Sequence, residues 1–143
     1  MTRRNGSAEW QGSVEHGSGT VTVGDGVFTG AYSYDSRFGE GEGTNPEQLI
    51  AAGLAACFTM ALSNLLSSAG HVPDSLHTDA RVQLRNIDGR PSLTRIDLDS
   101  QGRVPDVDEA QFRSYAQEAK ANCPVSRALA GIPDIALTAN LAS

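Results

Sequence analysis

The sequence lacks the features that mark several large classes of protein. Its 143 residues include only two cysteines, which have neither the spacing of a metal site nor the density of a small disulfide-rich secreted domain. Its single lysine and its arginines form no run, and the net charge is -6 with a pI near 4.9. A chain of this charge is not expected to bind nucleic acid or an anionic membrane surface.

The sequence also lacks an internal repeat, a low-complexity segment and the apolar core of a signal peptide behind its basic N-terminal residues. We therefore expect a cytoplasmic protein, in which two thiols are either inert core residues or redox groups. With 39% hydrophobic and 20% charged residues, the chain has the composition of a single globular domain covering residues 1–143.

One long helix is predicted in the stretch 44–68, and the other elements can be placed relative to it. Asn45 is a good N-cap, and Pro46 suits the first helical position because its missing N–H would have no partner there. Gly70 accepts the left-handed conformation that closes a helix, and Pro73 cannot extend one.

Residues 49–66 carry no charge, so we expect this helix to be buried on every side. A membrane span is the competing interpretation, because about 20 apolar residues cross a bilayer. We favour a core helix, because the run is rich in small residues, contains Asn64 and has no basic flanks.

Short β-strands are expected before the long helix. Ser7–Val14, Gly19–Val23 and the segment 27–29 are separated by turn signals and indicate an antiparallel meander. Trp10 is interpreted as a packing residue of the first strand. Residues 32–43 are expected to form an irregular, functional loop that leads into the helix.

Two long strands, two helices and a final strand are expected after the long helix. Ser75–Asn86 and Ser92–Val104 form a hairpin, and residues 106–122 have the spacing of an amphipathic helix. Pro124–Ala130 is a short second helix, and Ile135–Leu141 a last strand. The predicted fold class is α+β, with an antiparallel sheet and a long buried central helix.

Cys57 lies about a dozen residues into the long helix, where the helix dipole has faded. Burial raises the pKa of a thiol, so a reactive Cys57 thiolate requires a cation brought to it from elsewhere. Without such a cation, an inert core residue is the better interpretation of Cys57.

Cys123 stands at the N-cap position of the short helix, where its sulfur faces free N–H groups that lower the thiol pKa. Local electrostatics thus favour Cys123 as the more acidic thiol. The alternative, a helix cap made by a weak acceptor, stays open on the residues alone.

Four segments of the chain resemble the motifs of a known protein family. Together they resemble the OsmC/Ohr family of thiol peroxidases, and the arginine in the loop just before the long helix resembles the OsmC branch. The segments are Arg37-Phe38, Gly43-Thr44-Asn45-Pro46-Glu47-Gln48-Leu49, Ala55-Ala56-Cys57-Phe58-Thr59-Met60-Ala61-Leu62 and Asn122-Cys123-Pro124-Val125-Ser126.

The resemblance implies a cysteine-based peroxidase of oxidative and osmotic stress defence. It would reduce organic hydroperoxides, and hydrogen peroxide, without metal, flavin or other cofactor. Cys57 matches the peroxidatic cysteine and Cys123 the resolving one, which together would form a disulfide. Arg37 matches the activating cation and Glu47 the carboxylate that orients it. A dithiol of the dihydrolipoyl or thioredoxin type would restore the thiols.

An intertwined homodimer is expected from helix geometry. Cys57 follows Glu47 by ten residues on one helix, which is about 15 Å at a rise of 1.5 Å per residue. Glu47 and its own Cys57 cannot easily share one compact site, whereas a two-fold pair of helices could bring Glu47 of one subunit toward Cys57 of the other.

Two other functions fit part of the pattern. A cysteine hydrolase would need a histidine beside its thiol, and His16, His71 and His77 have no diagnostic spacing to either cysteine. On a helix, Cys57 has the small residues Gly53 and Ala61 and the apolar Leu54 and Met60 one turn away, which indicates an apolar pocket with the thiol at its base. A non-catalytic module that binds an apolar ligand, such as a lipid, could use this pocket. Peroxide consumption in the presence of a dithiol would separate a peroxidase from both.

Overall fold

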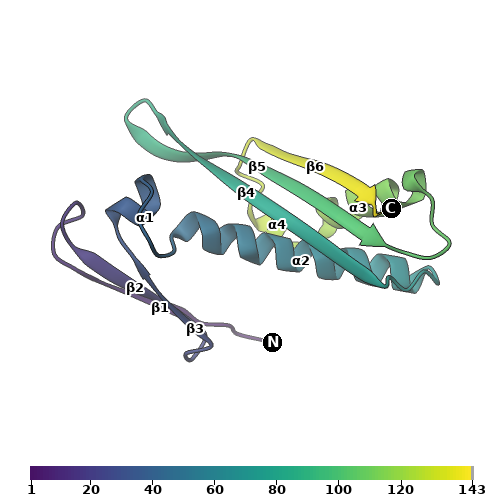
Figure 1. Cartoon of the computed structure of the whole chain (residues 1–143), viewed down its shortest axis with the longest axis horizontal. Coiled ribbons are helices and arrows are strands. Elements are labelled where there is room, and N and C mark those ends of the chain that lie inside the picture. The colour runs from purple at the N-terminus through teal and green to yellow at the C-terminus, as the bar shows by residue number, and fades with distance from the viewer. Residues whose placement is uncertain (143) are drawn as a thin grey trace. The chain divides into compact units, whose positions relative to one another are not determined.

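The computed structural model describes residues 1–142, and its helices and strands follow an α+β order (Figure 1). This fold class agrees with the prediction from the sequence. In chain order the elements are β1 (Gly6–Gln11), β2 (Ser18–Val23), β3 (Phe28–Tyr32), α1 (Tyr34–Phe38), α2 (Pro46–Ser68), β4 (Ser75–Ile87), β5 (Arg90–Arg103), α3 (Glu109–Asn122), α4 (Pro124–Ala128) and β6 (Asp134–Leu141).

The chain divides into two compact units, Met1–Leu49 and the remainder of the described residues from Ile50 onward. Helix α2 begins in the first unit and continues through the second. The expectation of a single domain stays a prediction, and each unit is described here by itself.

In the first unit, β1, β2 and β3 form the predicted antiparallel meander. Gly19 on β2 pairs with Trp10 on β1 and with Tyr32 on β3. A Cβ atom at Gly19 would lie 2.6 Å from both aromatic rings, so glycine is needed here for the rings to meet with their centroids 5.2 Å apart. The meander thus presents two neighbouring aromatic side chains at one end.

The segment after β3 differs from the expected irregular loop, because residues 34–38 form the short helix α1. Ser33 caps it by accepting a hydrogen bond from the Ser36 backbone N–H, and the Ser36 hydroxyl accepts one from the Ser33 N–H. This capping box uses serine where glutamate or glutamine is usual, so the pattern was not recognised in the sequence. The glycine-rich residues 39–43 are irregular, as expected.

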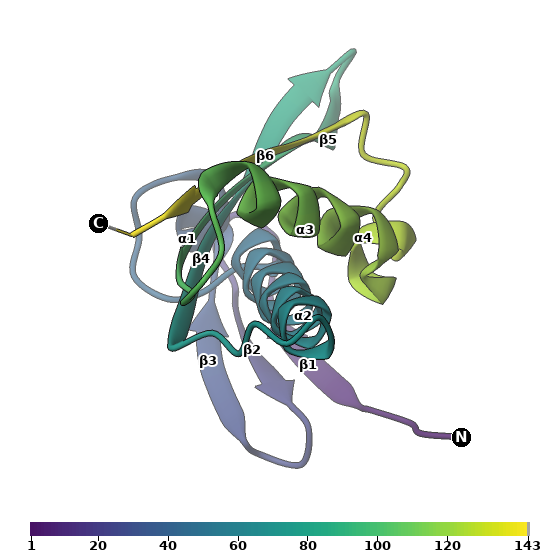
Figure 2. The same cartoon turned by 90° about the vertical axis from the view of Figure 1, so that its right-hand side faces the viewer.

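In the second unit, α2 and α3 cover one face of the sheet formed by β4, β5 and β6 (Figure 2). Alternate residues of β5, namely Ile96, Leu98 and Ser100, are buried against the helices. The buried core of this unit also contains Leu54, Phe58, Leu62, Leu66, Phe112, Ala116 and Ala119. The helices and the sheet therefore form a two-layer arrangement around one core.

Strand β6 pairs in parallel with β5, whereas β4 and β5 form the predicted antiparallel hairpin. The expectation of an antiparallel sheet is therefore wrong for β6. Helices α3 and α4 lie between β5 and β6 in the chain, and a crossover through helices returns the chain in the same direction. Helix α4, with Cys123 at its N-cap, is part of this crossover.

The ends of α2 agree closely with the prediction. Asn45 Oδ1 accepts a hydrogen bond of 2.8 Å from the Gln48 backbone N–H, as an N-cap does. Gly70 has φ of +88°, the left-handed conformation expected just beyond the helix. Local signals alone therefore defined the start and the end of the longest helix.

The expectation that α2 is buried on every side is wrong for the described chain. The residues Leu54, Phe58, Leu62 and Leu66 form one fully buried stripe. The opposite face, formed by Ala52, Gly53, Ala56, Met60 and Asn64, is exposed, with Met60 78% exposed. One sheet can cover only one side of a helix, so the other side needs a separate partner to be buried.

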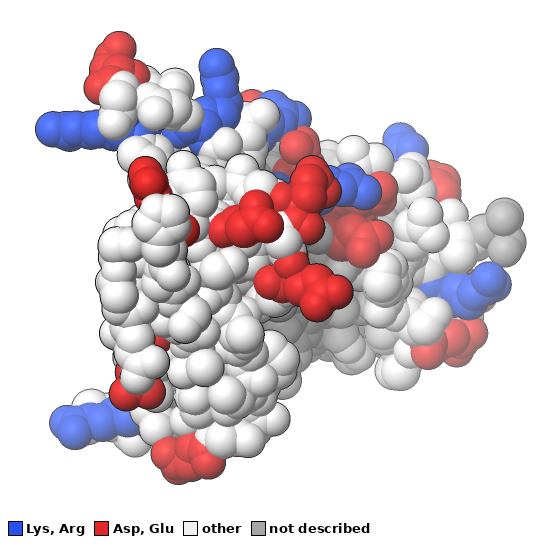
Figure 3. Space-filling view, turned by 60° about the vertical axis from the view of Figure 1, so that its left-hand side comes forward, with Lys and Arg blue, Asp and Glu red and all other residues white. Residues whose placement is uncertain are grey.

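Helix α2 is also the one helix among the described residues that is long and apolar enough to cross a membrane by length and composition. Its buried stripe instead packs into the core of the second unit. On the face drawn in Figure 3, acidic and basic side chains are interspersed without a continuous basic area.

We expect Phe58→Ala to lower the free energy of unfolding by about 3–5 kcal/mol, because it leaves a large cavity beneath a fully buried ring. Thermal or urea unfolding measures the loss. Met60→Ala, on the exposed face of α2, is the matched control and should change the free energy of unfolding little when the protein is dilute. An equal loss for both variants would contradict the described packing.

Candidate active site

Arg37 and Glu47 form an ion pair in the first unit. Arg37 Nη2 lies 2.8 Å from Glu47 Oε1, and Nε lies 3.2 and 3.3 Å from the two carboxylate oxygens. The Arg37 side chain is 37% exposed and that of Glu47 10%. A guanidinium held through two nitrogens has a defined orientation, and Nη1 makes no hydrogen bond to the described residues.

The backbone around this pair is tied together by short polar contacts. The Ser36 hydroxyl donates to the Thr44 carbonyl at 2.8 Å, and Asn45 Nδ2 donates to the Ser36 carbonyl at 2.9 Å. These bonds join α1 to Thr44 and Asn45, the two residues just before α2. Arg37 and Glu47 are therefore carried on segments that are fixed to each other. The structure thus brings together two of the four predicted site residues.

A small aromatic cavity of about 180 Å³ lies beside Arg37 in the same unit. The Arg37 guanidinium stands 5.3 Å from the centre of the Phe38 ring, and the Phe38 and Tyr34 rings are 4.9 Å apart. The cavity is lined by Trp10, Val14, Tyr32, Ser33, Tyr34, Arg37 and Phe38. Sequence reasoning treated Trp10 as packing alone, because only the meander and α1 together show that these side chains converge.

The two cysteines meet in the second unit. Both are free thiols, and the sulfur of Cys57 on α2 lies 2.7 Å from that of Cys123, the N-cap of α4. Cys123 is buried, whereas Cys57 is partly exposed. Two residues far apart in the sequence are therefore close enough to exchange a proton or to form a disulfide.

The first turn of α4 points N–H groups at both sulfurs. The Ser126 N–H donates to Cys123 Sγ at 3.5 Å, as predicted for an N-cap cysteine. The Val125 N–H also acts as a donor, and its effect is to lower the pKa of each thiol. This short helix therefore orients both thiols by backbone hydrogen bonds.

The two thiols differ in acidity within one chain. Burial raises the pKa of Cys57, and its hydrogen bond to Cys123 raises that pKa further. Burial also acts to raise the pKa of Cys123, but hydrogen bonds from Cys57, from the Ser126 hydroxyl and from backbone N–H groups outweigh it and lower the pKa. Cys123 is thus the more acidic thiol of the chain taken alone, as local electrostatics predicted.

Ser126 is a site residue that sequence reasoning did not assign. It is buried, and its hydroxyl has no regular hydrogen-bond partner within residues 1–142. The Cys123 sulfur is the group that it can serve, and this contact helps to lower the pKa of Cys123. A serine three residues after an N-cap cysteine, on the same turn, was the available signal.

We expect Ser126→Ala to raise the pKa of Cys123, because a donor to the thiolate is removed. In a Cys57→Ser background, which leaves Cys123 as the one thiol, its alkylation should then require higher pH. The matched control is Ser67→Ala on exposed α2 surface. If the pH dependence of Cys123 alkylation were the same with and without Ser126→Ala in the Cys57→Ser background, the role of the hydroxyl would be contradicted.

A metal site or a histidine–thiol pair would need a particular arrangement of side chains. Residues 1–142 contain no group of three or more His, Cys, Asp or Glu side chains placed to hold a metal ion. Within the same residues, no histidine forms a hydrogen bond to either sulfur; His77 pairs with Asp79, and His71 stacks edge-on against Tyr115.

The chain is similar in sequence to known proteins. A family model described as OsmC-like protein matches residues 39–138, a range that includes Glu47, Cys57 and Cys123. Peroxiredoxin OsmC from Escherichia coli (strain K12) is 44% identical over 127 residues, 88% of this chain and 89% of the relative. An organic hydroperoxide resistance protein from Xanthomonas axonopodis pv. citri (strain 306) is 34% identical over 99 residues, 68% of each protein.

The fold is also found in solved structures. An organic hydroperoxide resistance protein from Elizabethkingia anophelis, crystallised with bound thiocyanate, has a TM-score of 0.79 and 27% identity, with 99% of each chain covered. OhrB from Bacillus subtilis has a TM-score of 0.72 and 26% identity over 96% of this chain and 98% of the other.

Proposed function

Because this chain belongs to the OsmC-like protein family, we propose that it is a cysteine-based peroxidase that reduces organic hydroperoxides, and hydrogen peroxide, in oxidative stress defence. The observation that supports this proposal most directly is the 2.7 Å separation of the Cys57 and Cys123 sulfurs. A peroxidase with two cysteines needs such proximity, because the oxidised thiol must be captured by the second one before it is oxidised further.

In the proposed reaction the Cys57 thiolate attacks one peroxide oxygen, and the O–O bond breaks. The departing oxygen takes up a proton and leaves as an alcohol, while Cys57 becomes a sulfenic acid. The Cys123 thiolate then attacks the Cys57 sulfur, and the sulfenic oxygen leaves as water. A dithiol of the dihydrolipoyl or thioredoxin type reduces the resulting disulfide and is itself oxidised.

We assign the activation of Cys57 to Arg37. Within one chain the pKa of Cys57 is raised by burial, so the thiolate needs a cation that the second unit does not provide. The Arg37 guanidinium is oriented by Glu47, and its Nη1 is available for a hydrogen bond to the peroxide or the thiolate. The aromatic cavity beside Arg37 suits the organic part of a hydroperoxide.

We propose that an intertwined homodimer assembles this site. Cys57 follows Glu47 by ten positions on α2, about 15 Å along its axis. A second copy of the chain could supply Arg37 and Glu47 to each thiol pair and cover the exposed face of α2. Beside this face lies an open groove of about 560 Å³ lined by Ala55, Ala56, Thr59, Met60, Ser63, Pro73, Ser75, Leu76 and Thr78.

We expect the protein to sediment as a dimer at micromolar concentration and Met60→Glu to shift it toward monomer, because the change buries an unpaired charge. Peroxidase activity should fall in parallel with the loss of dimer. Val27→Glu, at an exposed apolar residue of the β2–β3 turn, is the control. A monomeric wild-type protein with full activity would refute the proposed assembly.

The function itself is tested by peroxide consumption with an excess of dithiol. Turnover of an alkyl hydroperoxide is expected, together with a Cys57–Cys123 disulfide in the mass spectrum after one equivalent of peroxide. A protein that only binds apolar ligands would gain thermal stability from them without consuming peroxide. We further propose the cytoplasm as the compartment, because both cysteines are free thiols and a reducing compartment keeps thiols in that form.

A further inference from the structure

Three hydroxyl groups, those of Thr59, Thr78 and Ser100, form a network that links α2 to the sheet of the second unit. The Thr78 hydroxyl on β4 lies 3.1 Å from that of Ser100 on β5 and 2.7 Å from that of Thr59 on α2. The Thr59 hydroxyl also donates to the Ala55 carbonyl at 2.7 Å. The hydroxyl network therefore runs from the middle strand of the sheet, through β4, to the backbone of the helix.

The sheet end of the network is fixed in place. Ser100 is 0% exposed and shares the inner face of β5 with Ile96 and Leu98. A buried hydroxyl without a partner is costly, and within residues 1–142 the Ser100 hydroxyl has Thr78 as its hydrogen-bond partner. Thr78 also pairs directly with Ser100 in the register of the two strands. The network thus offers Thr59 one defined position on the sheet.

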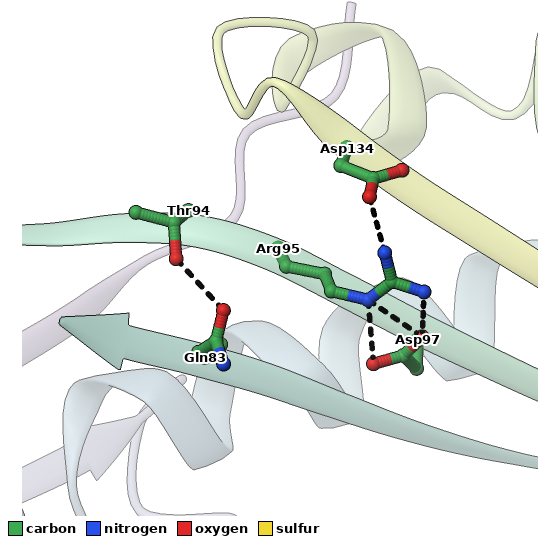
Figure 4. Close-up of polar contacts among 5 residues, drawn as sticks. All are labelled: Gln83, Thr94, Arg95, Asp97 and Asp134. Atoms are coloured by element: carbon green, nitrogen blue, oxygen red, sulfur yellow. Dashed lines mark hydrogen bonds and ion pairs between the residues drawn. The ribbon is translucent and has the colours of Figure 1, made fainter.

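Polar contacts elsewhere in the sheet do not involve α2 (Figure 4). Arg95 binds Asp97 on its own strand and Asp134 on β6. The Thr94 hydroxyl donates to Gln83 Oε1 at 3.0 Å, an exposed contact between β5 and β4. Thr94 is therefore a threonine of the same sheet whose hydroxyl takes no part in placing the helix.

The network and the thiol pair lie on different sides of α2. Thr59 follows Cys57 by two residues, so the two side chains project about 200° apart around the helix axis, at about 100° per residue. On one side Thr59 is bonded to the sheet, and on the other Cys57 Sγ lies 2.7 Å from Cys123 Sγ. A rotation of α2 about its axis would therefore move the Thr59 hydroxyl and the Cys57 sulfur together.

The buried stripe of α2 does not by itself define this rotation, because hydrophobic attraction has no preferred direction. Hydrogen bonds do have one, and they weaken steeply when they are bent or stretched. We propose that the hydroxyl network sets the rotation of α2 on the sheet and so holds the Cys57 sulfur beside that of Cys123. Thr59 and Thr78 are positioning residues, because they act on the sulfur through the helix. The inference rests on the proposed function for its effect on turnover, whereas the alignment of the thiols is measured without peroxide.

The test measures how readily the two thiols form a disulfide in equilibrium with glutathione. Oxidised glutathione is reduced to two thiols as the Cys57–Cys123 bond forms, so the equilibrium constant gives the effective concentration of one cysteine at the other. Thr78→Val keeps the shape of the side chain and removes its hydroxyl. We expect the effective concentration to fall about 5- to 10-fold, because a misplacement of about 1 Å at a reactive site can cost about 100-fold. Thr78→Ser restores the hydroxyl and should keep the wild-type value.

Two controls separate alignment from a general loss of stability. Thr94→Val removes a threonine hydroxyl of the same sheet and should leave the thiol equilibrium unchanged. Val104→Ala, at a buried apolar residue just beyond β5, should lower the free energy of unfolding and also leave that equilibrium unchanged. An unchanged equilibrium in Thr78→Val, or an equal fall in either control, would overturn the proposal.

Thr59→Val breaks the link from the helix side and leaves the contact between Thr78 and Ser100 in place. It should give a similar fall, and its combination with Thr78→Val should give no further one, because one link can be lost only once. Effects that multiply in the double variant would contradict a single network. A wild-type protein without peroxide turnover would refute the proposed function but not this result, whereas wild-type thiol equilibria in both single variants would refute the inference even in an active peroxidase.

Discussion

Cys57→Ser is expected to abolish peroxide turnover, because a serine hydroxyl is not ionised at neutral pH and cannot attack the peroxide oxygen. The isosteric change keeps the helix and its packing, so circular dichroism and thermal unfolding should stay close to those of the wild-type protein. Peroxide consumption with excess dithiol measures the loss, which should reach the rate of the uncatalysed reaction.

Cys123→Ser is expected to react once with peroxide and then to stop. Without the second thiol at 2.7 Å, the Cys57 sulfenic acid has no partner in the chain. Repeated exposure should therefore drive Cys57 to sulfinic and sulfonic acid, which intact mass spectrometry detects as added oxygen atoms. A small dithiol should partly restore turnover, because it can capture the sulfenic acid from solution.

The contrast between the two variants is informative because the electrostatics within one chain oppose the assignment of Cys57 as the peroxidatic cysteine. Hydrogen bonds lower the pKa of Cys123, whereas burial raises that of Cys57. If acidity in the single chain decided the chemistry, Cys123 would be the peroxidatic residue and the two phenotypes would be exchanged. A sulfenic-acid probe followed by peptide mapping decides the question, and label on Cys123 alone would overturn the proposed roles.

Arg37→Ala is expected to lower the rate of Cys57 with peroxide at pH 7 by about 10- to 1,000-fold, the range that loss of an adjacent cation produces. Removing a positive charge raises the pKa of the nearby thiol, so less thiolate is present at neutral pH. Raising the pH should restore much of the reactivity toward iodoacetamide, but less of the peroxidase activity, because the hydrogen bond to the peroxide is also lost.

Two further variants define the role of the Arg37–Glu47 pair. Glu47→Gln should cause a smaller loss, because the cation remains but its carboxylate partner is removed. Arg90→Ala, at the exposed first residue of β5, should have no effect. Alkylation of Cys57 in Arg37→Ala with an unchanged pH dependence would show that this arginine does not activate the thiol.

Local sequence signals predicted most elements of the fold. The cap at Asn45, the proline after it and the glycine at position 70 define the ends of α2, because each acts through the backbone of its own helix end. The hairpin between β4 and β5 was recognised in the same way, and its turn places Asp88 and Gly89 at positive φ.

Three features of the fold could not be predicted from the sequence and were recognised only in the tertiary structure. The pairing direction of β6 depends on the path of the chain through α3 and α4, and no periodicity within the strand encodes it. The exposed face of α2 depends on how many layers surround the helix. Helix α1 depends on a capping box built from two serines, whose hydroxyls form turns as readily as caps.

The sequence by itself determined the fold class and the ends of the long helix, because caps and turns act over a few neighbouring residues. The four residues assigned to the chemistry follow from the resemblance to the OsmC/Ohr family, and their roles stay predictions. The resemblance implied that Cys57 meets Cys123 and that Glu47 orients Arg37, and the tertiary structure places both pairs in contact. The exposed face of α2 and the parallel pairing of β6 were decided by the tertiary structure alone. Features of this kind depend on how whole elements pack against one another, which the residues of one element do not encode.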